Sequence, residues 1–167
     1  YSSETTSVTT GDSKIELNAL SVHNFNNPQY ALKGTVDVTI PNFHYLSDIE
    51  GYKLDGHIVG GFSSKGNVDA FNSFTKDFFR NIQLQANLHC DDIEIEAPEG
   101  SPYNLEKVSG HLVFTNGDVS ADSVSGLLQS QQFSLKGEAS DFISYLLLND
   151  VNTYCDIRCT IDKIDLV

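Results

Sequence analysis

The stretch YALKGTVDVTI, from Tyr30 to Ile40, alternates apolar and polar residues along most of its length. Every second residue, beginning with Tyr30, is apolar or glycine, and the residues between them include Lys33 and Asp37. Successive side chains of a β-strand point to opposite faces of the sheet, so this pattern predicts a strand with one apolar and one wet face. Such strands are typical of antiparallel sheets.

The same alternation recurs along the chain, in KIELNAL, YKLDGHIVGGF, NIQLQANLHC, VSGHLVF and TYCDIRCTI. We therefore predict a mainly β, antiparallel fold. The phase slips after Cys90, which predicts a bulge or tight turn at Asp91 and Asp92, and a further slip precedes Val124. TNGD, which ends at Asp118, predicts a hairpin turn.

Two stretches show helical spacing instead and predict one or two short helices. The first places Phe71, Phe74 and Phe78 on one side, and the second does the same for Phe142, Tyr145 and Leu146.

A short motif that contains Lys-Gly, which we call the Lys-Gly phrase, occurs three times in the chain. FSSKGNVDAFNSF, from Phe62, and FSLKGEASDFISY, from Phe133, match at six positions without a gap, and YALKG from Tyr30 is a fainter copy. This predicts one β-rich domain over residues 14–167, built of related repeats at about 14–80 and 81–167. The polar opening, residues 1–13, predicts a flexible lead-in. Because the chain lacks methionine, we expect a piece of a longer protein.

Composition argues against several function classes. The net charge is −13, which disfavours binding to nucleic acid or strong attraction to anionic headgroups. The five histidines form no ligand-like pair, and the serines lie in no nucleophile motif, so we predict no catalytic residue, no metal and no cofactor. Weak calcium binding stays open at the acidic run between Asp91 and Glu96.

The three cysteines are interpreted as small buried hydrophobes. Cys155 and Cys159 would lie about 13 Å apart along one strand, too far for a disulfide with each other. Pairing of Cys90 with one of them across strands stays open.

The order of motifs from about Tyr30 to Asp150 resembles that of AsmA-like proteins of Bacteroidetes-type bacteria, near their C-terminal domain. The matching motifs are Ser109-Gly110, Asn116-Gly117, Ser125-Gly126, Leu135-Lys136-Gly137 and Ser140-Asp141. The resemblance implies a strongly curved and twisted sheet of the repeating β-groove type. It also implies a non-enzymatic, periplasmic body, held at the inner membrane through a missing N-terminal segment, that bridges phospholipids toward the outer membrane. The cysteines depart from the family's pattern.

On this hypothesis one apolar face lines a groove for the acyl chains of phospholipid or another lipid. Its lipid-facing residues would be Val36, Val38, Leu54, Ile58, Leu84, Leu88, Leu112, Phe114, Leu128, Leu135, Ile157 and Ile161. Alternation alone favours an ordinary core, so a closed β-sandwich that binds a protein or glycan partner is the alternative. Unpaired edge strands leave an edge-strand dimer open.

Overall fold

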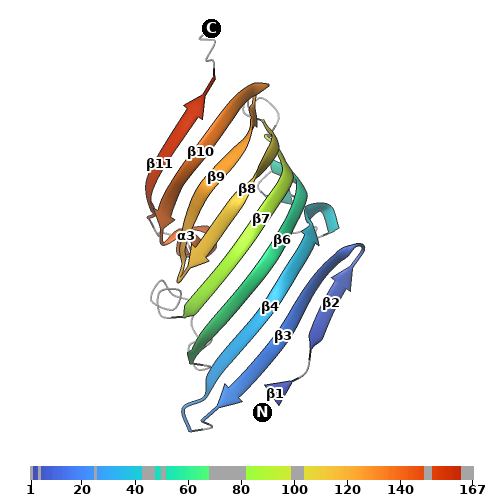
Figure 1. Cartoon of the computed structure of the whole chain (residues 1–167), viewed down its shortest axis with the longest axis vertical. Coiled ribbons are helices and arrows are strands. Elements are labelled where there is room, and N and C mark those ends of the chain that lie inside the picture. Colours follow the sequence, from blue (N-terminus) through green and yellow to red (C-terminus); the bar gives the residue numbers. More distant parts are fainter. Residues whose placement is uncertain are drawn as a thin grey trace.

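The computed structural model describes residues 2–3, 5–24, 26–42, 48–49, 52–67, 82–98, 104–148 and 152–162. These residues form one antiparallel sheet of 11 strands (Figure 1). Its main path runs β1, β3, β4, β6, β7, β8, β9, β10, β11, while β2 pairs with β3 and β5 pairs with β6. The strands are β1 Ser2–Ser3, β2 Thr6–Thr10, β3 Ser13–His23, β4 Gln29–Thr39, β5 Asp48–Ile49, β6 Tyr52–Asn67, β7 Gln83–Glu96, β8 Leu105–Thr115, β9 Asp118–Leu128, β10 Gln131–Ser140 and β11 Tyr154–Ile161.

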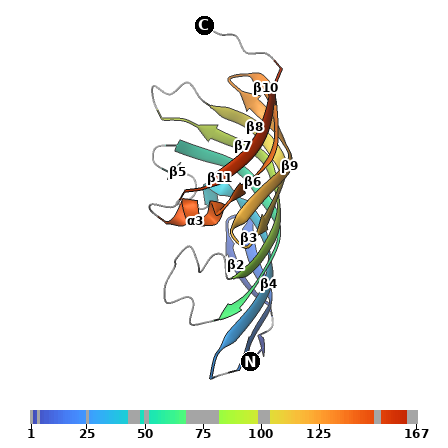
Figure 2. The same cartoon turned by 90° about the vertical axis from the view of Figure 1, so that its left-hand side faces the viewer.

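The predicted fold class is confirmed, because the chain is mainly β, antiparallel and open. Figure 2 shows that the sheet is curved and that the short helix α3, Phe142–Leu147, lies on the inner side of the curve. A 3-10 turn, η1 Ile40–Asn42, follows β4. No second sheet packs against the first within the described ranges, so a closed β-sandwich is not the arrangement that these strands adopt.

The cross-strand register carries the apolar alternation through the whole sheet. Residues directly opposite each other in neighbouring antiparallel strands point to the same face. One row of such partners therefore crosses the sheet from β3 to β11, in the order Ile15, Val36, Gly60, Leu88, Leu112, Ala121, Gly137 and Ile157.

The predicted irregularities lie where the sequence places them. Asp92 has a positive φ of 51°, and the register of β7 with β8 shifts between Cys90 and Ile93. Asn116 and Gly117 have φ of 53° and 102° and form the two-residue turn between β8 and β9. Positive φ at both residues is the geometry of a type I′ hairpin turn. The register between β8 and β9 shifts again just before Val124.

The first two Lys-Gly phrases pair with each other. Tyr30, which opens the first, lies opposite Gly66 of the second, and Phe62, which opens the second, lies opposite Gly34 of the first. The phrase thus supplies an aromatic residue and a glycine four positions later, and antiparallel pairing brings each aromatic against the other copy's glycine. In addition, the Tyr30 hydroxyl is 2.8 Å from Ser64 Oγ.

The helix predicted around Phe142 is confirmed as α3, whereas the stretch with Phe71, Phe74 and Phe78 lies outside the described residues. The structure differs from the flexible lead-in predicted for residues 1–13. Thr6–Thr10 forms β2, which pairs with β3 over five residues, and Ser13 is fully buried. A hairpin supplies partners for the backbone groups of this polar run, so it needs no apolar core of its own. The division of residues 14–167 into related repeats stays a prediction.

The interpretation of the cysteines as buried hydrophobes is wrong for two of them. Cys155 and Cys159 are exposed, Cys90 is half-buried, and all three are free thiols. The reason is position, since β11 is the last strand of the sheet and α3 packs mainly beside β9. Burial raises the pKa of the Cys90 thiol.

A continuous apolar face as the candidate functional site

All twelve residues predicted to face lipid lie on the same face of the sheet. Val38 faces Ile58, and the same row continues through Cys90, Gly110 and Val124 to Leu135. Leu54 begins a row that reaches Leu128 through Ile95 and Leu105. The remaining members join this face through the pairs Ser64 with Leu84, Ala86 with Phe114, and Phe133 with Ile161. We call this surface the apolar face.

Alternation marks further members that the prediction did not include. Ile93 faces Val108 across β7 and β8, and Val124 faces Leu135 across β9 and β10. On β3, Leu20 lies opposite Leu32. The predicted set was therefore a sample of a larger surface that spans β3 to β11.

The apolar face is covered unevenly. Val38 and Ile93 are 7% and 9% exposed, whereas Ile157 on β11 is 50% exposed. Most of the other members, including Leu88 and Leu112, are half-buried. On β11 the exposed Ile157 lies between the exposed Cys155 and Cys159 on the same side of the strand. Contiguous exposed apolar surface is typical of a binding or interaction site.

Helix α3 covers the apolar face at one end. The rings of Phe114 and Phe142 have centroids 6.5 Å apart. Ile143 and Leu148 pack with Leu84 against the buried Ile82. Because Phe114 and Leu84 belong to the apolar face, α3 lies on that face, which Figure 2 shows as the inner side of the curve. The apolar face is therefore the concave one.

Glycines on the concave face allow neighbouring strands to lie close together. A Cβ on Gly34, Gly60 or Gly137 would overlap a backbone carbonyl oxygen of the neighbouring strand, and one on Gly110 would lie 2.5 Å from Ser123 O. Glycines of this kind let backbones approach and sheets bend. They alternate with Leu and Val residues along the same rows, so the concave face consists of aliphatic ridges separated by bare backbone.

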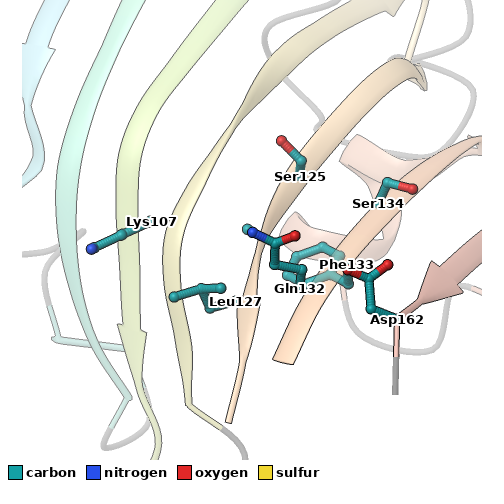
Figure 3. A pocket seen from close by; sticks show the side chains of 8 residues that line it. Lys107, Ser125, Leu127, Gln132, Phe133, Ser134 and Asp162 are labelled. Carbon is teal, nitrogen blue, oxygen red and sulfur yellow. The ribbon is translucent and has the colours of Figure 1, made fainter. Parts of the chain in front are cut away.

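The polar, convex face also carries shallow hollows. One of about 520 Å³ lies over β9 and β10 (Figure 3). Ser125 lies opposite Ser134 there and Leu127 lies opposite Gln132. The hollow is also lined by Lys107, Gly126, Phe133 and Asp162. One cation, one anion and a few uncharged groups on an open surface give no specific chemistry.

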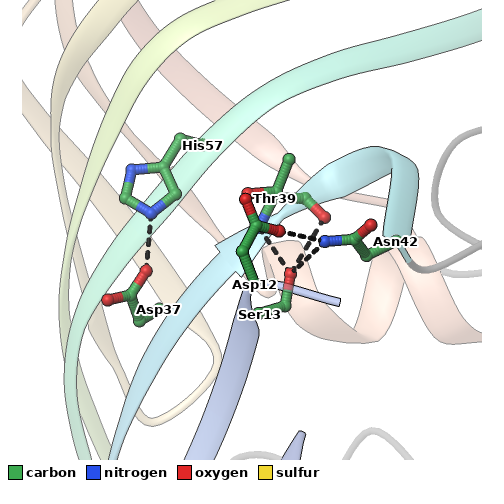
Figure 4. A network of polar contacts seen from close by, with 6 residues as sticks. All are labelled: Asp12, Ser13, Asp37, Thr39, Asn42 and His57. Atoms are coloured by element: carbon green, nitrogen blue, oxygen red, sulfur yellow. Dashed lines mark hydrogen bonds and ion pairs between the residues drawn. The ribbon is translucent and has the colours of Figure 1, made fainter. Parts of the chain in front are cut away.

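A polar network secures the N-terminal hairpin to the end of β4 (Figure 4). Thr39 N donates to Ser13 Oγ at 2.9 Å, and Asn42 Nδ2 donates to Ser13 Oγ at 2.9 Å and to Asp12. On the polar face nearby, His57 Nε2 is 2.7 Å from Asp37 Oδ1. These groups satisfy one another, which fits a structural role.

The described part of the chain holds no cluster of three or more His, Cys, Asp or Glu residues arranged for a metal ion. Among the helices of the described residues, none has the length and apolar character needed to cross a membrane. Comparison of the chain with protein-family models, with curated proteins and with solved structures gave no match.

Proposed function

We propose that this chain is a non-enzymatic segment of a cell-envelope protein that shelters the acyl chains of phospholipids on its concave face. The observation that carries this proposal is the continuity of the apolar face across a single open, curved sheet. An ordinary sandwich would bury that face against a second sheet, whereas here most of its members are half-buried and Ile157 on β11 is 50% exposed.

Acyl chains suit this surface in shape and chemistry. The face offers aliphatic side chains and bare backbone and few polar atoms, so it can replace water around a hydrocarbon chain without recognising a particular headgroup. Each methylene that is sheltered contributes about 0.8 kcal/mol. Contact with even half of a long acyl chain would therefore give appreciable binding energy before the entropic cost of ordering the chain.

The charge distribution favours recognition through the tails. Acidic residues such as Asp37, Glu94 and Asp156 alternate with members of the apolar face and so lie on the convex side. With a net charge of −13 the chain would repel anionic headgroups at long range. A headgroup would accordingly stay in water at the rim of the curve while the tails lie on the concave face.

The resemblance to AsmA-like proteins extends the proposal to location. In that setting the segment would belong to a periplasmic body, anchored at the inner membrane by a part of the protein that precedes it. It would help to bridge phospholipids toward the outer membrane. The order of Lys-Gly, Ser-Gly and Asn-Gly motifs supports this part of the proposal.

Uptake of a fluorescent phospholipid tests the proposal. The purified chain is mixed with phosphatidylcholine vesicles that carry a self-quenched fluorescent phosphatidylethanolamine, and the vesicles are then removed by flotation. We expect fluorescence to remain with the protein and to be displaced by unlabelled phospholipid. A protein fraction without label, together with no phospholipid in organic extracts of protein isolated from bacterial envelope, would contradict the proposal.

A further inference from the structure

β11 is the terminal strand at one end of the sheet that the described residues form. β11 pairs with β10 over eight residues without a register shift, and no described strand pairs with its other side (Figure 1). Tyr154–Ile161 contains no proline and no lysine, the devices that commonly block such edges. The opposite edge of the sheet, by contrast, is broken into the short strands β1 and β2.

The sequence of β11 is complementary to itself in the antiparallel direction. If two copies pair around Ile157, that residue faces its own equivalent, and Cys155 faces Cys159 on the apolar side. On the polar side Asp156 faces Arg158 of the other copy, and Arg158 faces the other Asp156. The pairing of two short strands would thus contain two opposed Asp–Arg pairs and two opposed cysteine pairs.

Neighbouring registers lack this match. Centring the pair on Asp156 would set two aspartates against each other, and centring it on Arg158 would do the same for two arginines. Like charges directly opposite each other destabilise an antiparallel pair. Charge therefore selects Ile157 as the centre.

Within one chain the same charges are poorly matched. Across β10 and β11, Lys136 lies opposite Arg158, and Glu138 lies opposite Asp156. The ion pairs found in the described part of the chain do not include Asp156 or Arg158. A second copy would thus provide both residues with the directly opposed counter-charge that their own sheet does not.

The backbone groups at the edge fit this pairing. Asp162 N donates to Gln132 O at 3.1 Å, and the register makes these two residues direct partners. Hydrogen-bonding groups of an edge strand point alternately toward and away from the neighbouring strand. Asp162 points toward β10, and Ile157 lies an odd number of residues before it, so the N–H and C=O groups of Ile157 point away from β10. Two copies can then exchange hydrogen bonds at Ile157, with opposed Cα atoms about 5.5 Å apart, a separation that also permits a disulfide between Cys155 and Cys159.

We propose that β11 is a homodimerisation edge, which pairs antiparallel with β11 of a second copy around Ile157. A two-fold axis perpendicular to the sheet keeps apolar side against apolar side. The concave faces of the two copies would become one longer surface. This inference rests on charge complementarity and edge geometry and holds whether or not the surface binds lipid.

Charge reversal tests the register. D156R and R158D are each expected to lower self-association by about tenfold or more in sedimentation velocity, because each sets like charges against each other twice. An equimolar mixture of the two variants, and the double variant D156R/R158D, should associate as the wild type does. Each substitution also relieves a like-charge opposition with Glu138 or Lys136, so circular dichroism should show folded protein throughout.

Disulfide capture tests the same register independently. In a C90A background, oxidised glutathione takes the two electrons of a thiol pair and leaves as two molecules of reduced glutathione. C155A and C159A alone should give little cross-linked dimer, whereas their mixture should give at least about tenfold more, because only there does Cys159 face Cys155. A wild type that is monomeric at all concentrations, association unchanged by D156R, or equal cross-linking in single and mixed samples would overturn the proposal.

Discussion

Phe62 of β6 lies directly opposite Gly34 of β4, and a Cβ added to Gly34 would lie 2.6 Å from Phe62 Cζ. The reciprocal pair, Tyr30 opposite Gly66, lies on the same face of the same two strands. Each aromatic ring therefore occupies space that the opposing glycine leaves free. The repeated phrase is in this respect a packing device, and it secures the register between the strands that carry it.

The first prediction concerns this close approach. Gly34→Ala should lower the free energy of unfolding by about 1–3 kcal/mol, because the methyl group would overlap Glu16 O and crowd the Phe62 ring. Chemical denaturation followed by circular dichroism measures it. Gly61→Ala is the matched control, since its Cβ would meet only Gly34 O, at 3.7 Å, and it should change stability by no more than about 0.5 kcal/mol. Equal effects at both positions would show that the close approach is unimportant.

The second prediction concerns the network at the N-terminal hairpin. Ser13→Ala should cost about 1–3 kcal/mol, because Ser13 is 0% exposed and its loss leaves the Thr39 amide without this acceptor. Ser7→Ala, on the exposed strand β2, is the control and should be close to neutral. Urea denaturation provides both values. If Ser13→Ala were neutral, the hairpin would be held to β4 by the strand pairing alone.

The third prediction concerns thiol reactivity. Iodoacetamide reacts with the thiolate, and burial raises the pKa of Cys90. At pH 8 the half-buried Cys90 should therefore be alkylated several-fold more slowly than the exposed Cys155 and Cys159. Peptide mass spectrometry over a time course follows each residue. In urea the three rates should converge, and a Cys90 that reacts fastest in the folded protein would contradict the described packing.

The segments that form strands were predictable from the sequence, because the alternation of apolar and polar residues is visible within each segment alone. The Asn116-Gly117 turn and the slip after Cys90 were predictable for the same reason. The turn at Gln129 and Ser130 was not, although both residues have positive φ, 50° and 64°. Neither residue is a usual signal for that geometry, and the turn is imposed by the pairing of β9 with β10.

The composition of the candidate site was predictable, but its extent was not. The alternation of side chains along each strand predicted that Leu88 and Ile157 lie on the apolar side of their own strands. The register of the strands joins the two residues in one row of the same face. Which part of the face is covered depends on the contact of Phe142 with Phe114 and on the position of β11 at the sheet edge. Both are long-range relationships, so the exposure of Cys155 and Cys159 could not be derived from their own neighbourhood.

The fourth prediction tests the central claim, that the concave face shelters acyl chains. Leu88→Glu places a charge on that face, and Asn87→Glu places the same charge one residue away on the convex face. Both variants should remain folded by circular dichroism. Native mass spectrometry of protein incubated with phospholipid should show bound lipid in the wild type and in Asn87→Glu, and at least about tenfold less in Leu88→Glu. Absence of lipid from the wild type, or equal occupancy of the two variants, would contradict the account.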